Sequence, residues 1–133
     1  MMEMMTAQRR IPSQMLKGVI SGCMLAVIAQ GETYGYEISQ KLNNYGFGTI
    51  AEGTIYPVLL RLEKNDFIAA SYRPSELGPK RKYYAITERG ESELADFRDE
   101  FGMLSTAVKN LLAGNEHDDN DNTVPEQSKG ARS

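Results

Sequence analysis

The 133-residue sequence has one cysteine, one histidine and no tryptophan. Cys23 therefore has no partner for a disulfide within the chain, which favours a reducing, cytoplasmic location. The single histidine, His117, lies in an acidic C-terminal segment, and the sequence has no glycine-rich phosphate loop and no cluster of metal ligands. These absences argue against an enzyme, and we expect neither a cofactor nor a metal.

Long hydrophobic runs are also missing. The longest mostly apolar run, GVISGCMLAVIA, is shorter than the roughly 20 residues that a membrane-spanning helix needs. The methionine-rich start has no apolar segment behind its arginines, so it does not read as a signal peptide. We therefore expect no association with a membrane.

The net charge of −3 is concentrated at one end of the chain. Residues 1–113 hold 13 basic and 13 acidic side chains, whereas residues 114–133 hold 2 basic and 5 acidic ones. This tail has one valine as its only sizeable apolar side chain, so it is expected to be disordered. The remainder of the chain is neutral overall, which leaves a nucleic-acid partner open.

Hydrophobic spacing predicts four helices and one β-hairpin. Ser13 and Thr33 are expected to cap the first two helices, and Thr87 opens the last one with Glu88 and Glu91 in its first turn. A six-residue connection, PSELGP, would join the two strands. The expected elements are helices over 13–30, 33–46, 51–66 and 87–113 and strands over 67–73 and 80–86.

This order is that of a winged helix-turn-helix. The predicted fold class is mainly α with a small β-hairpin wing, followed by a C-terminal dimerisation helix. A winged helix can bind DNA, but it can also serve as a protein-interaction module that does not bind DNA specifically. The choice between the two depends on the residues of the third helix and the wing.

A proline within the third helix points to a binding surface. The core face of this helix would consist of Ile55, Val58, Leu59 and Leu62. The opposite face would consist of Gly53, Pro57, Leu60 and Lys64. A proline inside a helix costs about 3 kcal/mol or more in general, but Gly53 and Pro57 make this face thin enough to approach a DNA groove closely. The alternative is that these two residues only shape the start of the helix.

The side chains beside this strip and in the wing are suited to phosphates. Thr54, Tyr56 and Arg61 flank the strip. Lys80, Arg81 and Lys82 follow the Gly-Pro pair of the hairpin, where three cations fit a phosphate backbone or a minor groove. Strand alternation points Arg81 opposite to the two lysines. The alternative is that these charges protect an exposed edge from aggregation.

Three blocks of the sequence resemble one protein family. They are YGYEI at 34–38, EGTIYPVLLRLEKNDFI at 52–68 and GPKRKYYAITERG at 78–90. In order and spacing they resemble the PadR family of bacterial transcriptional regulators. The resemblance implies a homodimeric repressor that binds a palindromic double-stranded DNA operator, with contacts at Tyr36, at 53–57 and in the basic wing. It also implies release by a small-molecule or stress signal, since members often control phenolic-acid detoxification or drug efflux.

The sequence departs from the family pattern at three points. Asn65-Asp66 stands where the family usually has a glycine, and these residues enter left-handed geometry more readily than most. Leu60 replaces a commonly polar residue. The absence of tryptophan argues against the mode of sensing in which members with a dimer pore hold drugs between two tryptophans.

The last helix carries a heptad pattern that predicts a dimer. Its seam consists of Leu94, Phe97, Phe101, Leu104, Val108 and Leu111. Part of the seam could pack on the chain's own first helix, but a second copy is the simplest cover for the whole of it. A two-fold dimer would place two recognition helices about 34 Å apart, one DNA turn. The expected segments are a flexible arm (1–12), the winged helix (13–86), the dimerisation helix (87–113) and the tail (114–133).

Overall fold

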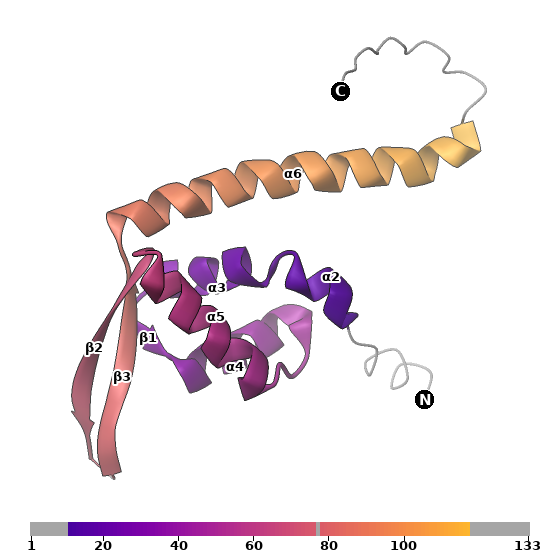
Figure 1. The fold of residues 1–133 in the computed structure, drawn as a ribbon. Helices are drawn as coiled ribbons and strands as arrows, with labels where there is room; N and C mark the ends of the chain where they lie inside the picture. Colours follow the sequence, from indigo (N-terminus) through magenta and orange to yellow (C-terminus); the bar gives the residue numbers. More distant parts are fainter. Residues whose placement is uncertain (1–10, 77, 118–133) are drawn as a thin grey trace, which may run out of the picture. The chain divides into compact units, whose positions relative to one another are not determined.

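The computed structural model describes residues 11–76 and 78–117 of the chain. These residues form a mainly helical fold with one small antiparallel sheet (Figure 1). The chain divides into two units between Phe97 and Arg98. Its elements are α2 (Ser13–Lys17), α3 (Ile20–Ala29), β1 (Thr33–Tyr34), α4 (Gly35–Leu42), the kinked turn η1 (Asn43–Phe47), α5 (Glu52–Lys64), β2 (Ile68–Ser75), β3 (Gly78–Ile86) and α6 (Glu88–His117).

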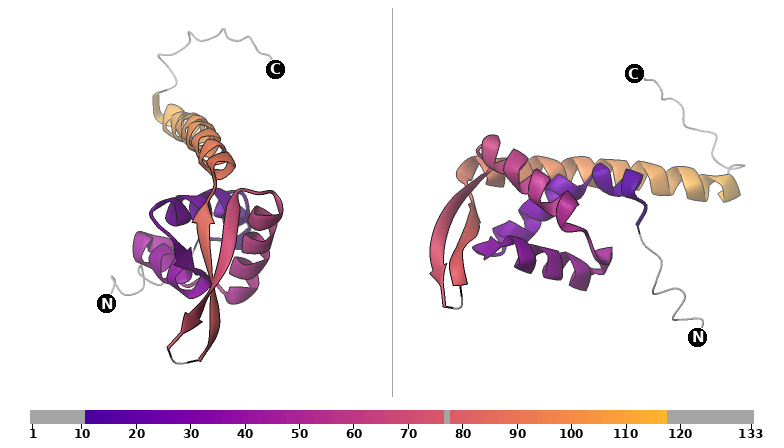
Figure 2. Two further views of the ribbon diagram at one scale, coloured as in Figure 1. Left: turned by 90° about the vertical axis from the view of Figure 1, so that its left-hand side faces the viewer. Right: turned by 60° about the horizontal axis from the view of Figure 1, so that its bottom comes forward.

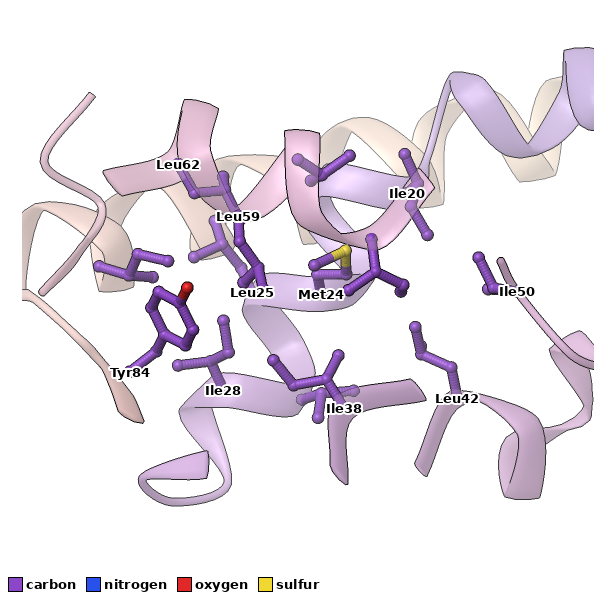
Figure 3. Close-up of a cluster of buried hydrophobic side chains, with 14 of the residues drawn as sticks. Ile20, Met24, Leu25, Ile28, Ile38, Leu42, Ile50, Leu59, Leu62 and Tyr84 are labelled. Carbon is purple, nitrogen blue, oxygen red and sulfur yellow. The ribbon is translucent and has the colours of Figure 1, made fainter. Parts of the chain in front are cut away.

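The core of the first unit lies among α3, α4 and α5 (Figure 3). Helix α3 is its centre, because six of its ten residues are buried, as its nearly all-round apolar sequence predicted. Ile38 and Leu42 cover it from α4, and Leu59 and Leu62 cover it from α5. Burying side chains of this size contributes about 1.5–3 kcal/mol each. The helical trio therefore fixes the direction in which the remaining faces of α4 and α5 point.

The two long strands form the predicted hairpin, whose far end projects beyond the helices (Figure 2). Residues Ile68 to Arg73 pair with Arg81 to Ile86, and the register shifts before Ser75 pairs with Gly78. The strands are longer than the sequence predicted, and a six-residue connection was wrong, because β2 extends past Pro74 to Ser75 and β3 begins at Gly78, before Pro79. A proline is tolerated in an edge strand or at an irregular register, and the shift lies beside Pro74.

A third strand was not predicted. Thr33 and Tyr34 form β1 and pair with Tyr84 and Tyr83, so β3 becomes the middle strand of the order β1-β3-β2. Thr33 is therefore not the cap of α4, which begins at Gly35 with Tyr34 as its N-cap. The buried Thr33 hydroxyl instead donates to Glu37 Oε1 at 2.5 Å. Two residues carry no strand periodicity, so only the long-range pairing shows this strand.

The first predicted helix is two helices. Helix α2 ends at Lys17 and α3 begins at Ile20, and the N-cap of α2 is Pro12, so the expected Ser13 cap is wrong. The amides of Gly18 and Val19 donate to carbonyls three residues back, which tightens the end of α2. Glycine is a weak helix former, and the break falls at Gly18. The apolar spacing continues across the break, so spacing alone did not reveal it.

The start of α6 is joined to the end of α5. Thr87 Oγ1 accepts a hydrogen bond from the Gly90 amide at 2.9 Å and donates one to the Asp66 carbonyl at 2.7 Å. Asp66 has a φ of 67°, the left-handed geometry expected for this position. Helix α6 runs to His117, four residues beyond its predicted end at residue 113. The arm up to residue 10 and the tail from residue 118 lie outside the described residues.

No helix formed by the described residues is long and apolar enough to cross a lipid bilayer. Helix α6 has the length for a span, but charged side chains recur along its sequence.

Replacing Thr87 by Ala is expected to lower the free energy of unfolding by about 1–2 kcal/mol, because it removes an N-cap and a second hydrogen bond. Urea denaturation followed by circular dichroism measures the change. Thr49→Ala, at an exposed position of the connection before α5, serves as the matched control. Equal midpoints for the two variants would contradict this role of Thr87.

Candidate nucleic-acid interface

Helix α5 has one buried and one exposed face. Its four predicted core residues, Ile55, Val58, Leu59 and Leu62, are all buried. The opposite face is exposed and consists of Gly53, Pro57, Leu60 and Lys64. A Cβ atom added at Gly53 would meet no atom within 4 Å, so the backbone is accessible at this point. Pro57 lies in the second turn of the helix, and because it has no N–H, the Gly53 carbonyl lacks its usual helical donor.

Tyr56 connects α5 to the start of α4. Its ring lies directly over Gly35, where an added Cβ would come within 2.6 Å of the Tyr56 hydroxyl oxygen. The next residue of α4, Tyr36, is exposed, and its hydroxyl accepts a hydrogen bond from Nε2 of Gln40, one turn further along the helix, at 3.1 Å. The glycine at the start of α4 thus allows two tyrosines, one from each helix, to lie beside the same surface.

These tyrosines line a groove of about 640 Å³ between the helices and the hairpin. Its other walls come from β1, from Leu60 of α5 and from β3. The full lining is Tyr34, Gly35, Tyr36, Tyr56, Leu60, Arg81, Lys82 and Tyr84. Aromatic rings, hydroxyl groups and two cations in one open groove suit a phosphate-sugar backbone.

The hairpin cations on one face of the sheet rest on tyrosine rings. The Arg81 guanidinium lies 4.2 Å from the centre of the Tyr34 ring, and that ring packs edge to face with Tyr83 at 5.3 Å. Arg73 lies 4.6 Å from the Tyr83 ring centre and forms an ion pair with Glu32. Each such contact with a ring is worth about 0.5–1 kcal/mol at an exposed site. The stack holds both arginines against the sheet.

On the other face, Lys82 connects the hairpin to α5. Its Nζ lies 3.1 Å from Glu63 Oε1, and its ammonium group also approaches the rings of Tyr72 and Tyr84. The hydrogen bond that Lys82 donates to Glu63 raises the pKa of Lys82 above its usual value, so this side chain stays charged at neutral pH. Burial raises the pKa of Tyr84, which keeps its hydroxyl protonated. Lys80 is exposed, and no ion pair among the described residues involves it.

The structure gathers most of the predicted DNA-binding residues around one surface. Tyr36, Tyr56, Arg81 and Lys82 line the groove, and Gly53, Thr54, Pro57 and Lys64 are exposed on α5. Arg61 is also exposed, but its Nη2 donates to Ser21 Oγ of α3 at 3.1 Å. This contact holds the arginine toward α3 while leaving much of it accessible.

Several residues of this surface were not singled out from the sequence. Tyr34 fell within the predicted helix over 33–46, and Tyr84, Tyr72 and Glu63 were not considered as part of the site. The alternation of cations and tyrosines in β3 was a usable signal, because residues two apart on a strand share a face. The Glu63 contact depends on how α5 meets the hairpin, which no local pattern encodes.

The predicted seam of α6 differs in exposure along its length. Leu94 is buried in the core, and Phe97 packs against that core with its ring where a side chain at Gly22 would lie. Further along, Leu104 is 58% and Leu111 71% exposed, and Phe101 and Val108 are 46% and 44% exposed. The first two seam residues therefore attach α6 to the core, and the other four present apolar surface.

Within residues 11–76 and 78–117, no three His, Cys, Asp or Glu side chains form a group that could hold a metal ion. Burial raises the pKa of the Cys23 thiol, which leaves it a weak nucleophile at neutral pH.

Comparison with known proteins identifies relatives. The model of the "Transcriptional regulator PadR-like family" matches residues 24–96. A protein of Lysinibacillus sphaericus without an assigned function is 34% identical over 106 residues, which cover 78% of this chain and 97% of that protein. A transcriptional regulator of Mycobacterium tuberculosis is 29% identical over 89 residues, 67% of this chain and 78% of that one. The crystal structure of a PadR-like transcriptional regulator from Bacillus cereus is 54% identical, with a TM-score of 0.68 over 76% of this chain and 98% of that one.

Replacing Gly35 by Ala is expected to destabilise the fold by about 1 kcal/mol, because the new methyl group displaces the Tyr56 ring. In a Tyr56→Ala background the same change is expected to be neutral or stabilising, since Ala is the better helix former. A double-mutant cycle of urea denaturation measures the coupling. Equal effects of Gly35→Ala in the two backgrounds would show that the ring does not require the glycine.

Proposed function

The chain belongs to the PadR-like family of transcriptional regulators, and on this premise we propose that it represses transcription by binding a palindromic DNA operator as a homodimer. PadR-type regulators bind DNA through a winged helix-turn-helix and are not enzymes. Beyond the membership of this family, we propose that the chain is a repressor, that its operator is two-fold symmetric, that the residues described below contact the DNA, and that it acts in the cytoplasm. The observation that carries it is the thin, exposed face of α5 beside the hairpin cations.

Helix α5 is the recognition helix of this proposal. Side chains at Gly53 and Pro57 are absent or short, so the helix backbone reaches deeper into a major groove than an ordinary helix face does. The Pro57 ring offers apolar contact to a thymine methyl group, and Thr54 and Tyr56 supply hydroxyl groups beside it. Lys64 and Arg61 at the other end of the helix bind phosphates.

The three hairpin cations have different roles. Lys80 is the most available for a phosphate, because it is exposed near the end of the hairpin. Arg81 binds phosphate from a fixed position over Tyr34, without losing its contact with the ring. Lys82 holds the hairpin to α5 through Glu63 and binds DNA only in competition with that carboxylate. Tyr36 completes the phosphate contacts at the start of α4.

A second copy of the chain covers the exposed part of the α6 seam. Leu104, Val108 and Leu111 are large apolar side chains in heptad register, and α6 carries no buried residue at their level. Leu94 and Phe97, at the start of the seam, pack on the chain's own core and so anchor this end of α6. In a two-fold dimer the two copies of α5 read two half-sites one DNA turn apart. A small-molecule or stress signal that changes this arrangement would release the operator.

Replacing Gly53 by Leu is expected to move stability and DNA binding in opposite directions. A Cβ atom added at this position meets no atom within 4 Å, and Leu is a better helix former than Gly by about 0.5–1 kcal/mol, so the melting temperature is expected to rise or stay the same. The same side chain holds α5 away from the groove, and affinity for the operator falls by at least about tenfold. Fluorescence anisotropy with DNA from upstream of the chain's own gene measures binding. Unchanged affinity would remove α5 from the interface.

The double variant Lys64→Ala, Lys80→Ala is expected to weaken binding to all DNA sequences alike. Log affinity also falls less steeply with log salt. The magnitude of this slope decreases by up to about 1.8, since each lost phosphate contact removes about 0.9. The matched control is Lys17→Ala, an exposed lysine on α2. An unchanged slope in the double variant, or no salt-dependent binding by the parent chain, would favour a protein-interaction module.

Replacing Leu104 and Leu111 by Asp is expected to dissociate the dimer, because each carboxylate would be buried without a partner. Operator affinity then falls toward the non-specific level, since the second half-site no longer acts at high effective concentration. Sedimentation velocity and anisotropy on the same samples test both effects. Met103→Asp, an exposed residue of α6 off the seam, is the control. A double variant that sediments as a dimer would place the interface elsewhere.

A further inference from the structure

A second, smaller groove lies on the first unit, between α3 and the kinked turn η1. It has a volume of about 320 Å³. Cys23, Ala26, Val27 and Gln30 of α3 form one wall, and Leu42, Tyr45 and Phe47 of α4 and η1 form the other. It shares no residue with the groove between α5 and the hairpin.

The lining of this groove indicates what it can hold. None of its seven residues carries a charge at neutral pH, and most of the wall is aliphatic or aromatic. Its polar contribution comes from one pair, in which Gln30 Nε2 donates to the Tyr45 hydroxyl at 3.0 Å. The volume is at the lower end of the range for small-molecule sites. A charged ligand would find no counter-ion here, whereas a flat neutral ring with one hydroxyl or carbonyl group matches both the apolar wall and the polar pair.

The wall formed by η1 is an unusual piece of backbone. The segment Asn43–Phe47 follows α4 directly, but Gly46 interrupts its helical geometry with a φ of 109° and a ψ of 6°. Gly46 and Gly48 have φ angles of 109° and 79°, which other residues adopt with difficulty. One of these glycines lies in the last part of the turn and the other directly after it, so both are placed where the backbone can rearrange at low cost.

This turn leads directly into the recognition helix. After Phe47 the chain passes through Gly48, Thr49 and the buried Ile50 to Ala51, whose carbonyl accepts the first hydrogen bonds of α5. A ring inserted between α3 and Phe47 moves η1 and, through this short connection, the first turn of α5 that contains Gly53. In this view η1 has one position without the ring and a displaced position with it. A ligand that binds the displaced position more tightly increases the population of that position.

We propose that this groove binds a small, neutral, aromatic molecule with a hydroxyl or carbonyl group, and that η1 transmits its binding to the start of α5. The inference names a place and a ligand class for the effector and to that extent rests on the proposed function. The binding itself needs no DNA, so it is tested separately. The alternative to a small molecule in this groove is helix α6 of a second copy of the chain.

The test uses 1-naphthol as the probe and the full chain labelled with ¹⁵N. In a titration up to about 1 mM followed by two-dimensional amide NMR, we expect saturable shifts at α3 and η1 and at the Gly53 and Thr54 amides of α5. Ala26→Leu fills the groove and is expected to weaken binding at least about tenfold, with the folded spectrum retained. Ala95→Leu, an exposed alanine of α6 outside the groove, is expected to bind like the parent chain.

Several results would overturn the proposal. Absence of saturable shifts, or shifts that map elsewhere and survive Ala26→Leu, would remove the site. Shifts at η1 without shifts at Gly53 and Thr54 would remove its connection to α5. Cys23, the one cysteine of the chain, reports on the competing occupant. Its alkylation rate is expected to be equal in the parent chain and in the Leu104→Asp, Leu111→Asp variant, and a several-fold slower rate in the parent would show that the second copy covers the groove.

Discussion

Helix α5 must be held by one face and leave the other free, and the rest of the site depends on this constraint. Four apolar side chains fix the rotation of the helix about its axis, because Ile55, Leu59 and Leu62 reach the centre of the core and Val58 lies beside them. A rotation of one residue, about 100°, would bury Pro57 and expose core residues. The helical trio is thus the support for a strip of helix that contributes almost nothing to folding.

The hairpin depends on the same helix. Lys82 meets Glu63 near the end of α5, and Thr87 bonds the Asp66 carbonyl just after it. Both contacts lie on the return of the chain from the hairpin, so the last turns of α5 position the wing and the start of α6 together. Tyrosine rings position the other hairpin cations. They hold Arg73 and Arg81 against the sheet, whereas such long flexible side chains would otherwise sample many rotamers.

The sequence predicted those parts of the fold that are encoded locally. The two faces of α5 follow from a 3.6-residue period, and the hairpin follows from two β-rich runs, so both were found. The strand β1 was missed because two residues carry no period and gain their structure from pairing with Tyr83 and Tyr84. The break at Gly18 was missed because the apolar pattern runs through it. The Lys82–Glu63 contact and the groove beside η1 depend on how distant segments meet, which no spacing rule describes.

The packing of Tyr56 on Gly35 also limits how sequences of this type can change over time. The two positions are 21 residues apart, yet a side chain at one of them is acceptable only if the ring at the other is smaller or turned away. A side chain at position 35 is therefore conditional on a change at position 56, and a lineage can acquire it only after the ring at position 56 has been replaced or has moved. In an alignment of relatives, this contact would appear as covariation between two residues, one of which has no side chain.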